Sequence, residues 1–380
     1  MRVTRIRDIA ELRPLREAWN RLTADVPFRT WQWVESCWLH FGASTVAASR
    51  RNVLSRALCI LVVHDAPGQL VGAAPLYIEH ERSGQAVLRL LGDDESCSDY
   101  LGLLSTPRNE RRVVQTLADW LTGEGHANWD LLELIGIDAE EDSLLLLSEA
   151  LAAHGATVHQ RGGLNCWRLE LPRTWDEYLA RISKSHRKQI RRAERQFFQS
   201  GRAEWHTVRS EEDLNRAFPI LVDLHQRRRR SLGEAGLFSS PAYAEFQREA
   251  AGRLLAQDML RLHWLSVDGQ PVSAEYNLAG RHIVYGYQSG LEPAALEIQP
   301  GRLSQLAAIR QAIEEGFTHY DFLRGDEPYK AHWRAQPRAT LELRVVPDKA
   351  MARIRHGLWL GRENVKHWVK AGLQIASPWS

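Results

Sequence analysis

Hydrophobic positions along the chain repeat with two spacings, and the same kinds of repeat occur in two successive series. Alternating, β-rich runs predict strands, and apolar positions three and four residues apart predict the helices between them. The first series has strands at 1–9, 57–64, 70–79, 87–91, 101–104 and 129–135 and helices at 10–23, 30–41, 111–121 and 143–154. The second has helices at 174–179, 183–198, 213–230, 241–255 and 302–315 and strands at 260–267, 272–278, 282–288, 319–323 and 340–346. Strands that alternate with helices predict layered α/β or α+β domains.

The second series begins just after Leu171-Pro172-Arg173, where we place a domain boundary. A chain of 380 residues is long enough for two or three separate cores. We therefore predict an N-terminal domain at 1–171, a C-terminal domain at 172–347 and a basic amphipathic tail at 348–380. We expect the strand at 340–346 to complete the sheet of the C-terminal domain.

The stretch from Val272 to Trp333 carries the most chemical information. It predicts a hairpin, a helix that begins at Pro300-Gly301, a short strand at 319–323 and then a polar loop. The first N–H groups of a helix have no partner within the helix, and they carry the positive end of its dipole. The Pro300-Gly301 junction is therefore a candidate anion site.

Bulk composition narrows the class of protein. The chain is 44% hydrophobic and 25% charged with a formal net charge of +2, which is typical of a globular protein. Its four cysteines are scattered, which argues against a disulfide framework or a zinc site, and we expect no metal. No run reaches the roughly 18 apolar residues of a membrane span. We expect a cytoplasmic protein, with contact to a membrane surface left open.

Two sequence phrases resemble a known family. Gln299-Pro300-Gly301-Arg302-Leu303 and the run from Asp321 to Trp333, DFLRGDEPYKAHW, resemble the acyl-CoA-binding half of a GNAT N-acyltransferase. They are more similar to the double-domain branch of CelD-type exopolysaccharide acetyltransferases and FemAB-like transferases. The resemblance extends to 28–33, 98–104 and 184–195. It implies two tandem GNAT-like domains, each a mixed twisted sheet flanked by helices, with the second domain catalytic.

The resemblance also implies a donor site. Pro300, Gly301, Arg302 and Leu303 would hold the diphosphate of acetyl-CoA or another acyl-CoA on their backbone N–H groups. The triplet Pro-Gly-Arg is also compatible with an ordinary helix start, because proline is common in the first turn.

Acyl transfer to an amine requires a base for the amine proton, donors for the oxyanion and a proton for the leaving group. We expect Asp321 or Glu275 to act as the base, Lys330 to hold the oxyanion or a phosphate, and Tyr329 to donate a proton. In the FemAB-like proteins that the chain resembles, a lysine matching Lys330 lies next to the reacting centre. The structural alternative is a loop in which Lys330 bridges Asp321 or Asp326. No residue has the setting of a covalent nucleophile.

A basic helix precedes the second domain's sheet. Its cationic stripe consists of Lys184, Arg187, Lys188, Arg191, Arg192 and Arg195. A merely solvated face would carry more acidic partners than the lone Glu194, so we expect Arg187, Arg191 and Arg192 to bind an anionic substrate. The basic run at 225–230 is equally compatible with a solvated helix end. The resemblance places Asp99 and Tyr100 at the domain cleft, where they and Trp333 would contact the acceptor.

These features predict transfer of an acyl group from acyl-CoA to an amine or a sugar, in exopolysaccharide or envelope biosynthesis. The alternatives are an aminoacyl transferase that uses charged tRNA, and a non-catalytic binding protein on a decayed transferase fold. We expect the tail at 348–380 to pack against the second domain; contact of its basic amphipathic face with an anionic membrane is the other interpretation.

Overall fold

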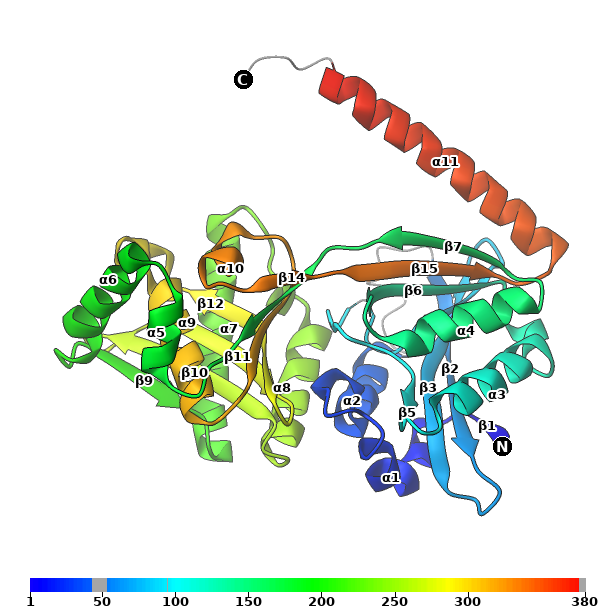
Figure 1. The fold of residues 1–380 in the computed structure, drawn as a ribbon, viewed down its shortest axis with the longest axis horizontal. Helices are drawn as coiled ribbons and strands as arrows, with labels where there is room; N and C mark the ends of the chain where they lie inside the picture. The colour runs from blue at the N-terminus through cyan, green and yellow to red at the C-terminus, as the bar shows by residue number, and fades with distance from the viewer. Residues whose placement is uncertain (43–52, 94, 376–380) are drawn as a thin grey trace.

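The protein is described by a computed structural model over residues 1–42, 53–93 and 95–375, with side chains as far as residue 362 (Figure 1). The first sheet contains β1 (Arg2–Ile6), β2 (Val53–His64), β3 (Leu70–Glu81), β4 (Ala86–Leu90), β5 (Leu104–Ser105), β6 (Leu131–Asp138), β7 (Thr157–Gly162) and β15 (Thr340–Val346). The second contains β8 (Cys166–Glu170), β9 (Ala203–Thr207), β10 (Leu260–Val267), β11 (Gln270–Ala279), β12 (Ile283–Leu291), β13 (His319–Arg324) and β14 (Gln336–Arg338). Both sheets mix parallel and antiparallel pairs, so the predicted pair of mixed sheets is confirmed.

Helices flank both sheets. They are α1 (Arg16–Asn20), α2 (Trp31–Phe41), α3 (Glu110–Thr122), α4 (Asp142–Ala153), α5 (Trp175–Arg181), α6 (Lys184–Ala193), α7 (Glu211–Ser231), α8 (Pro241–Leu255), α9 (Pro300–Glu314), α10 (Pro328–His332) and α11 (Ala350–Ile375). The predicted helix at 10–23 is instead a 3-10 turn at Ile9–Leu15 followed by the short α1. Pro14 lies inside that turn and has no N–H to donate to a regular helix.

The two sheets exchange strands. β7 belongs to the first sheet and β8 to the second, although only residues 163–165 separate them; β14 belongs to the second sheet and β15 to the first. Figure 1 shows this crossing where β7, β14 and β15 pass between the sheets. The N–H of Gly163 donates to the carbonyl of Thr340 at 2.8 Å, and the hydroxyl of Thr340 donates to the carbonyl of Leu164 at 2.7 Å. The crossing is thus held by hydrogen bonds on both chain segments.

The strand exchange corrects one expectation. Residues 340–346 do not complete the second sheet, because β15 pairs with β6 and β7 of the first sheet. Leu343 and Val345 on this strand are fully buried in the first domain's core, which no local pattern could assign to one sheet or the other. The division into 1–171 and 172–347 stays a prediction. β8 lies within 1–171 but belongs to the second sheet, and β15 lies within 172–347 but belongs to the first.

An aromatic core joins the two domains. Phe28, in the 3-10 turn before α2, packs against Tyr285 and Tyr287 of β12. Trp33 of α2 packs edge-on against Phe28, Tyr287 and Phe246 of α8. All five side chains belong to one buried cluster, which includes residues of both sheets. Burial of large aromatic side chains is among the strongest stabilising contributions available. The two domains are therefore held in a fixed arrangement.

The C-terminal helix packs differently from what we expected. The ring of Trp359 on α11 contacts His159 of β7, and the guanidinium of Arg344 of β15 lies 4.1 Å above it. Lys349 donates to the carbonyl of Trp129 at 2.6 Å. The described part of α11 thus packs against the first domain, and the expectation of packing against the second was wrong. No helix in the described segments is long and apolar enough to cross a membrane.

Candidate active site

The second sheet opens between two of its central strands. The parallel strands β12 and β13 pair from Ile283 with His319 to Tyr285 with Asp321, and no pair follows. Beyond Tyr285, β12 continues to Leu291 without β13 beside it. The helix α9 connects the two strands and begins at this open end. In open α/β sheets, ligands bind outside the carboxyl ends of the strands, which is where these elements meet.

The N-terminus of α9 has one free donor. Gln299 precedes it in the left-handed region, with φ of 55°, and gives no side-chain cap. The N–H groups of Arg302 and Leu303 donate back to the carbonyl of Gln299 at 2.9 and 3.2 Å. The N–H of Gly301 has no acceptor among the described residues. Of the four residues predicted to hold the diphosphate, Pro300, Gly301, Arg302 and Leu303, only Gly301 therefore has a free backbone N–H. Pro300 and Leu303 are also buried.

Arg302 carries a charge that no carboxylate of the described residues matches. Its guanidinium donates to the side-chain oxygens of Gln189 at 2.8 Å and Gln299 at 3.3 Å, and its Nε is buried without a partner. Burial lowers the pKa of this guanidinium from its ordinary value. Neutral amide oxygens compensate a buried charge only in part. The arrangement is suited to an anion that would supply the missing charge.

Two histidines lie beside this cationic region. The rings of His186 on α6 and His332 on α10 have centroids 3.9 Å apart. His186 is buried, and its Nε2 atom has no partner among the described residues. Burial, followed by His332, Arg302 and Arg334, lowers the pKa of His186 to about 4, and burial also lowers the pKa of His332. The His186 ring is therefore neutral at neutral pH, and its Nε2 atom is open to a hydrogen-bond partner.

The basic stripe of α6 lies beside the same region. Arg191 and Arg192 are exposed, and Arg187 is half-buried with its guanidinium donating to the carbonyl of Ile182 at 3.3 Å. None of the predicted stripe residues forms an ion pair with a carboxylate in the described part of the chain. Glu194 instead accepts from Trp175 and pairs with Arg310 at 3.4 Å. The surface around α6 and the start of α9 is thus positive and unneutralised.

Glu275 lies beneath this surface. Its carboxylate accepts hydrogen bonds from the hydroxyl of Ser304 and, at 3.1 Å, from the amide of Gln305, both on α9. The residue is 3% exposed, and no cation pairs with it among the residues described. Burial raises the pKa of Glu275 to about 7, while Ser304 and Gln305 lower it. A carboxylate with a pKa near neutrality is poised to act as a general base.

Tyr329 is the neighbouring acid. Desolvation of its hydroxyl, Glu327 and Glu275 together raise the pKa of Tyr329 above its ordinary value, although 47% of the residue is exposed. The hydroxyl therefore remains protonated at neutral pH and is available as a donor.

Asp321 is the centre of a domain contact. Its carboxylate accepts from the Tyr100 hydroxyl and from Nε of Arg168, both at 2.7 Å, and from the N–H of Leu323 at 2.8 Å. The side chain is fully buried. Because three donors occupy its oxygens, Asp321 is better suited to positioning than to proton abstraction.

Lys330 closes the loop that follows β13. Its ammonium donates to the carbonyls of Leu323, Arg324 and Gly325 at 3.1, 3.1 and 2.9 Å and pairs with Glu327 at 2.9 Å. Leu323 adopts φ of 57°, which is costly for a side-chain-bearing residue. Lys330 is 1% exposed and holds this strained turn. The structural alternative from the sequence fits this geometry, with Glu327 as the carboxylate partner in place of Asp321 or Asp326.

The predicted acceptor residues are inside the protein. Asp99 pairs with Nε of Arg324 at 3.2 Å and accepts its N–H at 3.1 Å, and burial raises the pKa of Asp99. Tyr100 binds Asp321, as described above. Trp333 is 2% exposed and packs against His186. The structure brings Asp99 and Tyr100 together with Asp321 but leaves none of the three predicted acceptor residues an open surface for a substrate.

Three residues of the site were not predicted, and of these only Arg168 had no signal in the sequence. Arg168 reaches Asp321 only because strand exchange places β8 beside β13. Ser304 and Gln305 lie on the predicted helix, one turn after Gly301, and helical spacing alone could have identified them as neighbours of its start. No group of three or more metal-ligating side chains occurs in the described segments.

Comparisons with known proteins agree with this geometry. Residues 184–331 match the family described as "Acetyltransferase (GNAT) domain". The fold is similar to the crystal structure of FemX, with a TM-score of 0.63 and 12% identity over 90% of this chain and 97% of that one. It is also similar to a conserved protein of unknown function from Bacteroides thetaiotaomicron, with a TM-score of 0.53 and 9% identity over 91% and 100% of the chains.

A third structure has the same fold. The C-terminal domain of a putative lysylphosphatidylglycerol synthetase from Agrobacterium fabrum aligns with a TM-score of 0.50 and 10% identity over 92% of this chain and 95% of that one. No curated protein sequence matches the chain significantly. The family match covers the basic helix α6, the Glu275 strand, α9 and Lys330.

Proposed function

Since residues 184–331 match a GNAT acetyltransferase domain and the two-domain fold is similar to that of FemX, we propose that the chain is an N-acyltransferase. It moves an acyl group from acyl-CoA to an amine or sugar acceptor. The observation that supports this most directly is Glu275, a buried carboxylate with a pKa of about 7, beneath a cationic helix start that has no carboxylate of its own.

The residues at the start of α9 fit a phosphate-bearing donor. The free N–H of Gly301 and the unmatched charge of Arg302 both belong to the first turn of α9, and a helix N-terminus favours an anion there. A Cβ on Gly301 would lie 3.3 Å from the methyl groups of Leu291, so the backbone is closely packed at this point. When bound, the donor supplies an activated thioester carbonyl.

The protein's own residues supply the proton transfers. The acceptor nitrogen bonds to the acyl carbon, the carbon–sulfur bond breaks, and the nitrogen loses one proton. Glu275 takes up that proton; because it is buried, the transfer runs through the Ser304 hydroxyl or a water molecule. Tyr329 gives a proton to the sulfur of the leaving group. Asp321 and Lys330 act as positioning residues that fix the end of β13.

A second candidate is an aminoacyl transferase that uses charged tRNA. It is favoured by one observation, the unneutralised stripe on α6, which suits a phosphate backbone. RNA bound there would dissociate steeply with added salt, whereas a donor held by backbone N–H groups depends on salt less. A non-catalytic binding protein is the third candidate. Because Asp321 and Lys330 are buried, their presence does not argue for catalysis. Glu275 and Tyr329 are therefore the residues that favour an active enzyme over a non-catalytic binding protein.

The pathway and location remain part of the proposal. The resemblance to CelD-type proteins suggests an acceptor from exopolysaccharide or envelope biosynthesis. The exposed apolar residues of α11 lie on one face, Met351, Ile354 and Leu358, each 58% exposed or more. Basic residues flank this face, so we propose that α11 can rest on an anionic membrane surface.

The experiment that tests the function is an acyl-transfer assay. The purified protein is supplied with acetyl-CoA and panels of amines and amino sugars, and release of free thiol is measured. We expect turnover with at least one acceptor, lost in Glu275→Gln and kept in Glu297→Gln, an exposed glutamate outside the site. Transfer only from charged tRNA would support the second candidate, and absence of transfer from either donor would contradict catalysis.

A further inference from the structure

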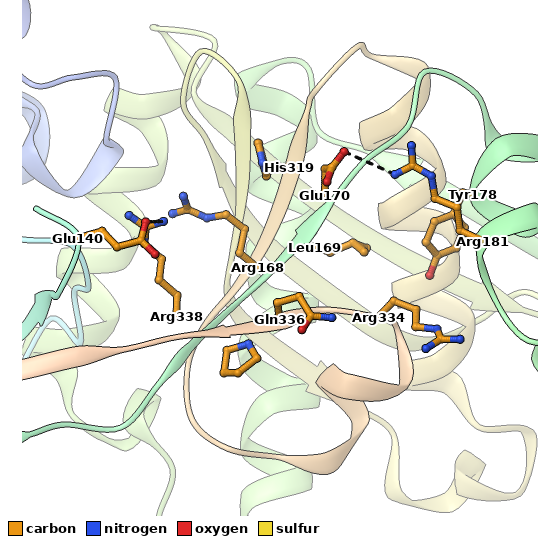
Figure 2. Close-up of a pocket in the computed structure, with 11 residues that line it drawn as sticks. Glu140, Arg168, Leu169, Glu170, Tyr178, Arg181, His319, Arg334, Gln336 and Arg338 are labelled. Carbon is orange, nitrogen blue, oxygen red and sulfur yellow. Dashed lines mark ion pairs between the residues drawn. The ribbon is translucent and has the colours of Figure 1, made fainter.

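A separate cavity lies at the edge of the second sheet, beside β8 and β14 (Figure 2). Its volume is about 380 Å³, within the range of small-molecule sites. Leu169, Tyr178 and Pro337 provide apolar lining, and Arg168, Arg181, Arg334 and Arg338 line it with guanidinium groups. The first-domain residue Glu140 also contributes, so the cavity lies where the two domains meet.

Two of these arginines have donors to spare. Arg168 uses only Nε to bind Asp321, and its two terminal nitrogens have no acceptor in the described part of the protein. Arg334 has no side-chain hydrogen bond or ion pair with any described residue. By contrast, Arg338 is fully engaged by Asp138 and Glu140, with contacts of 2.7 to 2.9 Å. Figure 2 shows Arg168 and Arg334 on either side of Leu169.

Arg334 is held in an unfavourable backbone conformation. Its φ is +69°, in the left-handed region where glycine is preferred. The end of α10 accounts for this conformation: the N–H of Arg334 donates to the carbonyl of Ala331 at 3.0 Å, and the N–H of Ala335 donates to that of Lys330 at 3.2 Å, the hydrogen bonds of a helix C-cap. A residue with a side chain is less favourable there than glycine. Arg334 is exposed, and its guanidinium makes no hydrogen bond or ion pair with a described residue, so glycine can replace it without loss of a side-chain contact.

The acidic residues of the lining do not neutralise these two groups. Glu170 pairs with Arg181 at a long 3.6 Å, and both side chains are at least half exposed. Glu140 is engaged by Arg338. His319, also in the lining, has its pKa lowered by burial and then by Arg168. The free donors thus face a region with positive potential and an apolar floor.

We propose that this cavity binds a small organic anion with oxyanion groups at both ends, a di- or tricarboxylate or a sugar bisphosphate. Arg168 and Arg334 each hold one end with paired N–H donors, the geometry that suits carboxylate and phosphate oxygens. The apolar floor of Leu169 and Tyr178 contacts the carbon skeleton between them. Because Arg168 also holds Asp321, occupancy of the cavity is linked to the turn that ends β13.

The test is direct binding to the full-length protein, independent of any transferase activity. Citrate, fructose 1,6-bisphosphate and inorganic phosphate are titrated separately by calorimetry in a buffer free of other polyvalent anions. We expect citrate or fructose 1,6-bisphosphate to bind at least tenfold more tightly than inorganic phosphate, because only the organic anions place an oxyanion group at each arginine. The preferred probe separates the carboxylate source from the phosphate source.

The key variant is Arg334→Gly, which removes the guanidinium and relieves the strained backbone. We expect a melting temperature no lower than that of the wild type, together with at least a tenfold loss of affinity for the preferred anion. Arg173→Gly, at an exposed position outside the lining, should leave affinity unchanged. Equal binding by the wild type and Arg334→Gly would overturn the proposal, as would wild-type affinity no greater for the organic anions than for inorganic phosphate.

Discussion

The two domains each contain a buried glutamate on a central strand, and the two glutamates have opposite surroundings. Glu79 on β3 pairs with Arg56 at 3.1 Å and with Arg89 at 2.6 Å. Glu275 on β11 has only the neutral Ser304 and Gln305 as partners. A buried charge matched by arginines stays ionised and structural, whereas an unmatched one shifts its pKa toward neutrality and becomes available for proton transfer.

The helices that connect parallel strands differ in the same way. In the first domain α3 lies between β4 and β6, and in the second α9 lies between β12 and β13. Glu110 begins α3, and burial, Asp142 and Glu141 raise its pKa. The first turn of α9 has no acidic residue. A similar crossover therefore presents carboxylates in one domain and a first turn without carboxylates in the other, so the charge of the helix start differs although the connection is alike.

The strongest test of this contrast removes the titratable carboxyl group of Glu275. We expect Glu275→Gln to lower kcat/KM by about 10²–10³-fold, the usual range for loss of a general base. In the wild type, activity should rise with pH through about 7, because the base must be ionised. The variant should lose this limb of the profile. An unchanged pH profile in Glu275→Gln would show that another group is the base.

The matching variant in the first domain should have the opposite effect. Glu79→Gln leaves two buried arginines without a full partner, and we expect it to lower the free energy of unfolding by roughly 3 kcal/mol. Urea denaturation measures this loss. The catalytic constants of the fraction that remains folded should stay near those of the wild type. A stable but inactive Glu79→Gln would break the proposed division of roles.

A variant of Lys330 tests whether this residue positions the loop or acts on the reacting atoms. Lys330→Met leaves the carbonyls of Leu323, Arg324 and Gly325 without their shared donor, and we expect a loss of about 3 kcal/mol in unfolding free energy. Lys188→Met on the exposed face of α6 is the control. If Lys330→Met instead kept full stability and lost only kcat, Lys330 would act on the reacting atoms.

The pKa of Glu275 also predicts a pH dependence of stability. Its pKa is raised from 4.5 to about 7 on folding, so between these values the folded chain holds a proton that the unfolded chain has released. Stability is therefore lost as pH rises from about 4.5 to 7, by on the order of 3 kcal/mol. Glu275→Gln should lack this loss, so its stability relative to the wild type should increase between pH 4.5 and 7. Parallel stability curves for the two proteins would contradict the pKa shift.

The smallest expected effect concerns the α6 stripe. Arg191→Glu should weaken acetyl-CoA binding about fivefold, equivalent to ~1 kcal/mol for one exposed charge. Arg230→Glu, exposed on α7, should leave it unchanged. Affinity for charged tRNA that falls much more than acetyl-CoA affinity in Arg191→Glu would favour the aminoacyl transferase.

Local patterns predicted most elements but not how the chain crosses between domains. The spacing of Asp213 to Arg230 and Pro241 to Leu255 identified α7 and α8, because each has an apolar face and a serine cap. The sequence could not predict which sheet contains 340–346, since the residue pattern of a buried strand does not specify the strands with which it pairs. The sequence identified Gly301 and Glu275 as candidate site residues. It could not show that Lys330 holds the loop after β13, because that role depends on burial and hydrogen bonds made by tertiary contacts.

The central claim is that an acyl donor binds at the start of α9 and not at the corresponding start of α3. Calorimetric titration with acetyl-CoA and desulfo-CoA tests it, using the wild type, Gly301→Glu and the control Asn109→Glu at the N-cap of α3. We predict micromolar binding that is kept in Asn109→Glu and weakened about 100-fold or more in Gly301→Glu, a difference of ~2.7 kcal/mol. No binding by the wild type, or equal binding by Gly301→Glu, would contradict the account.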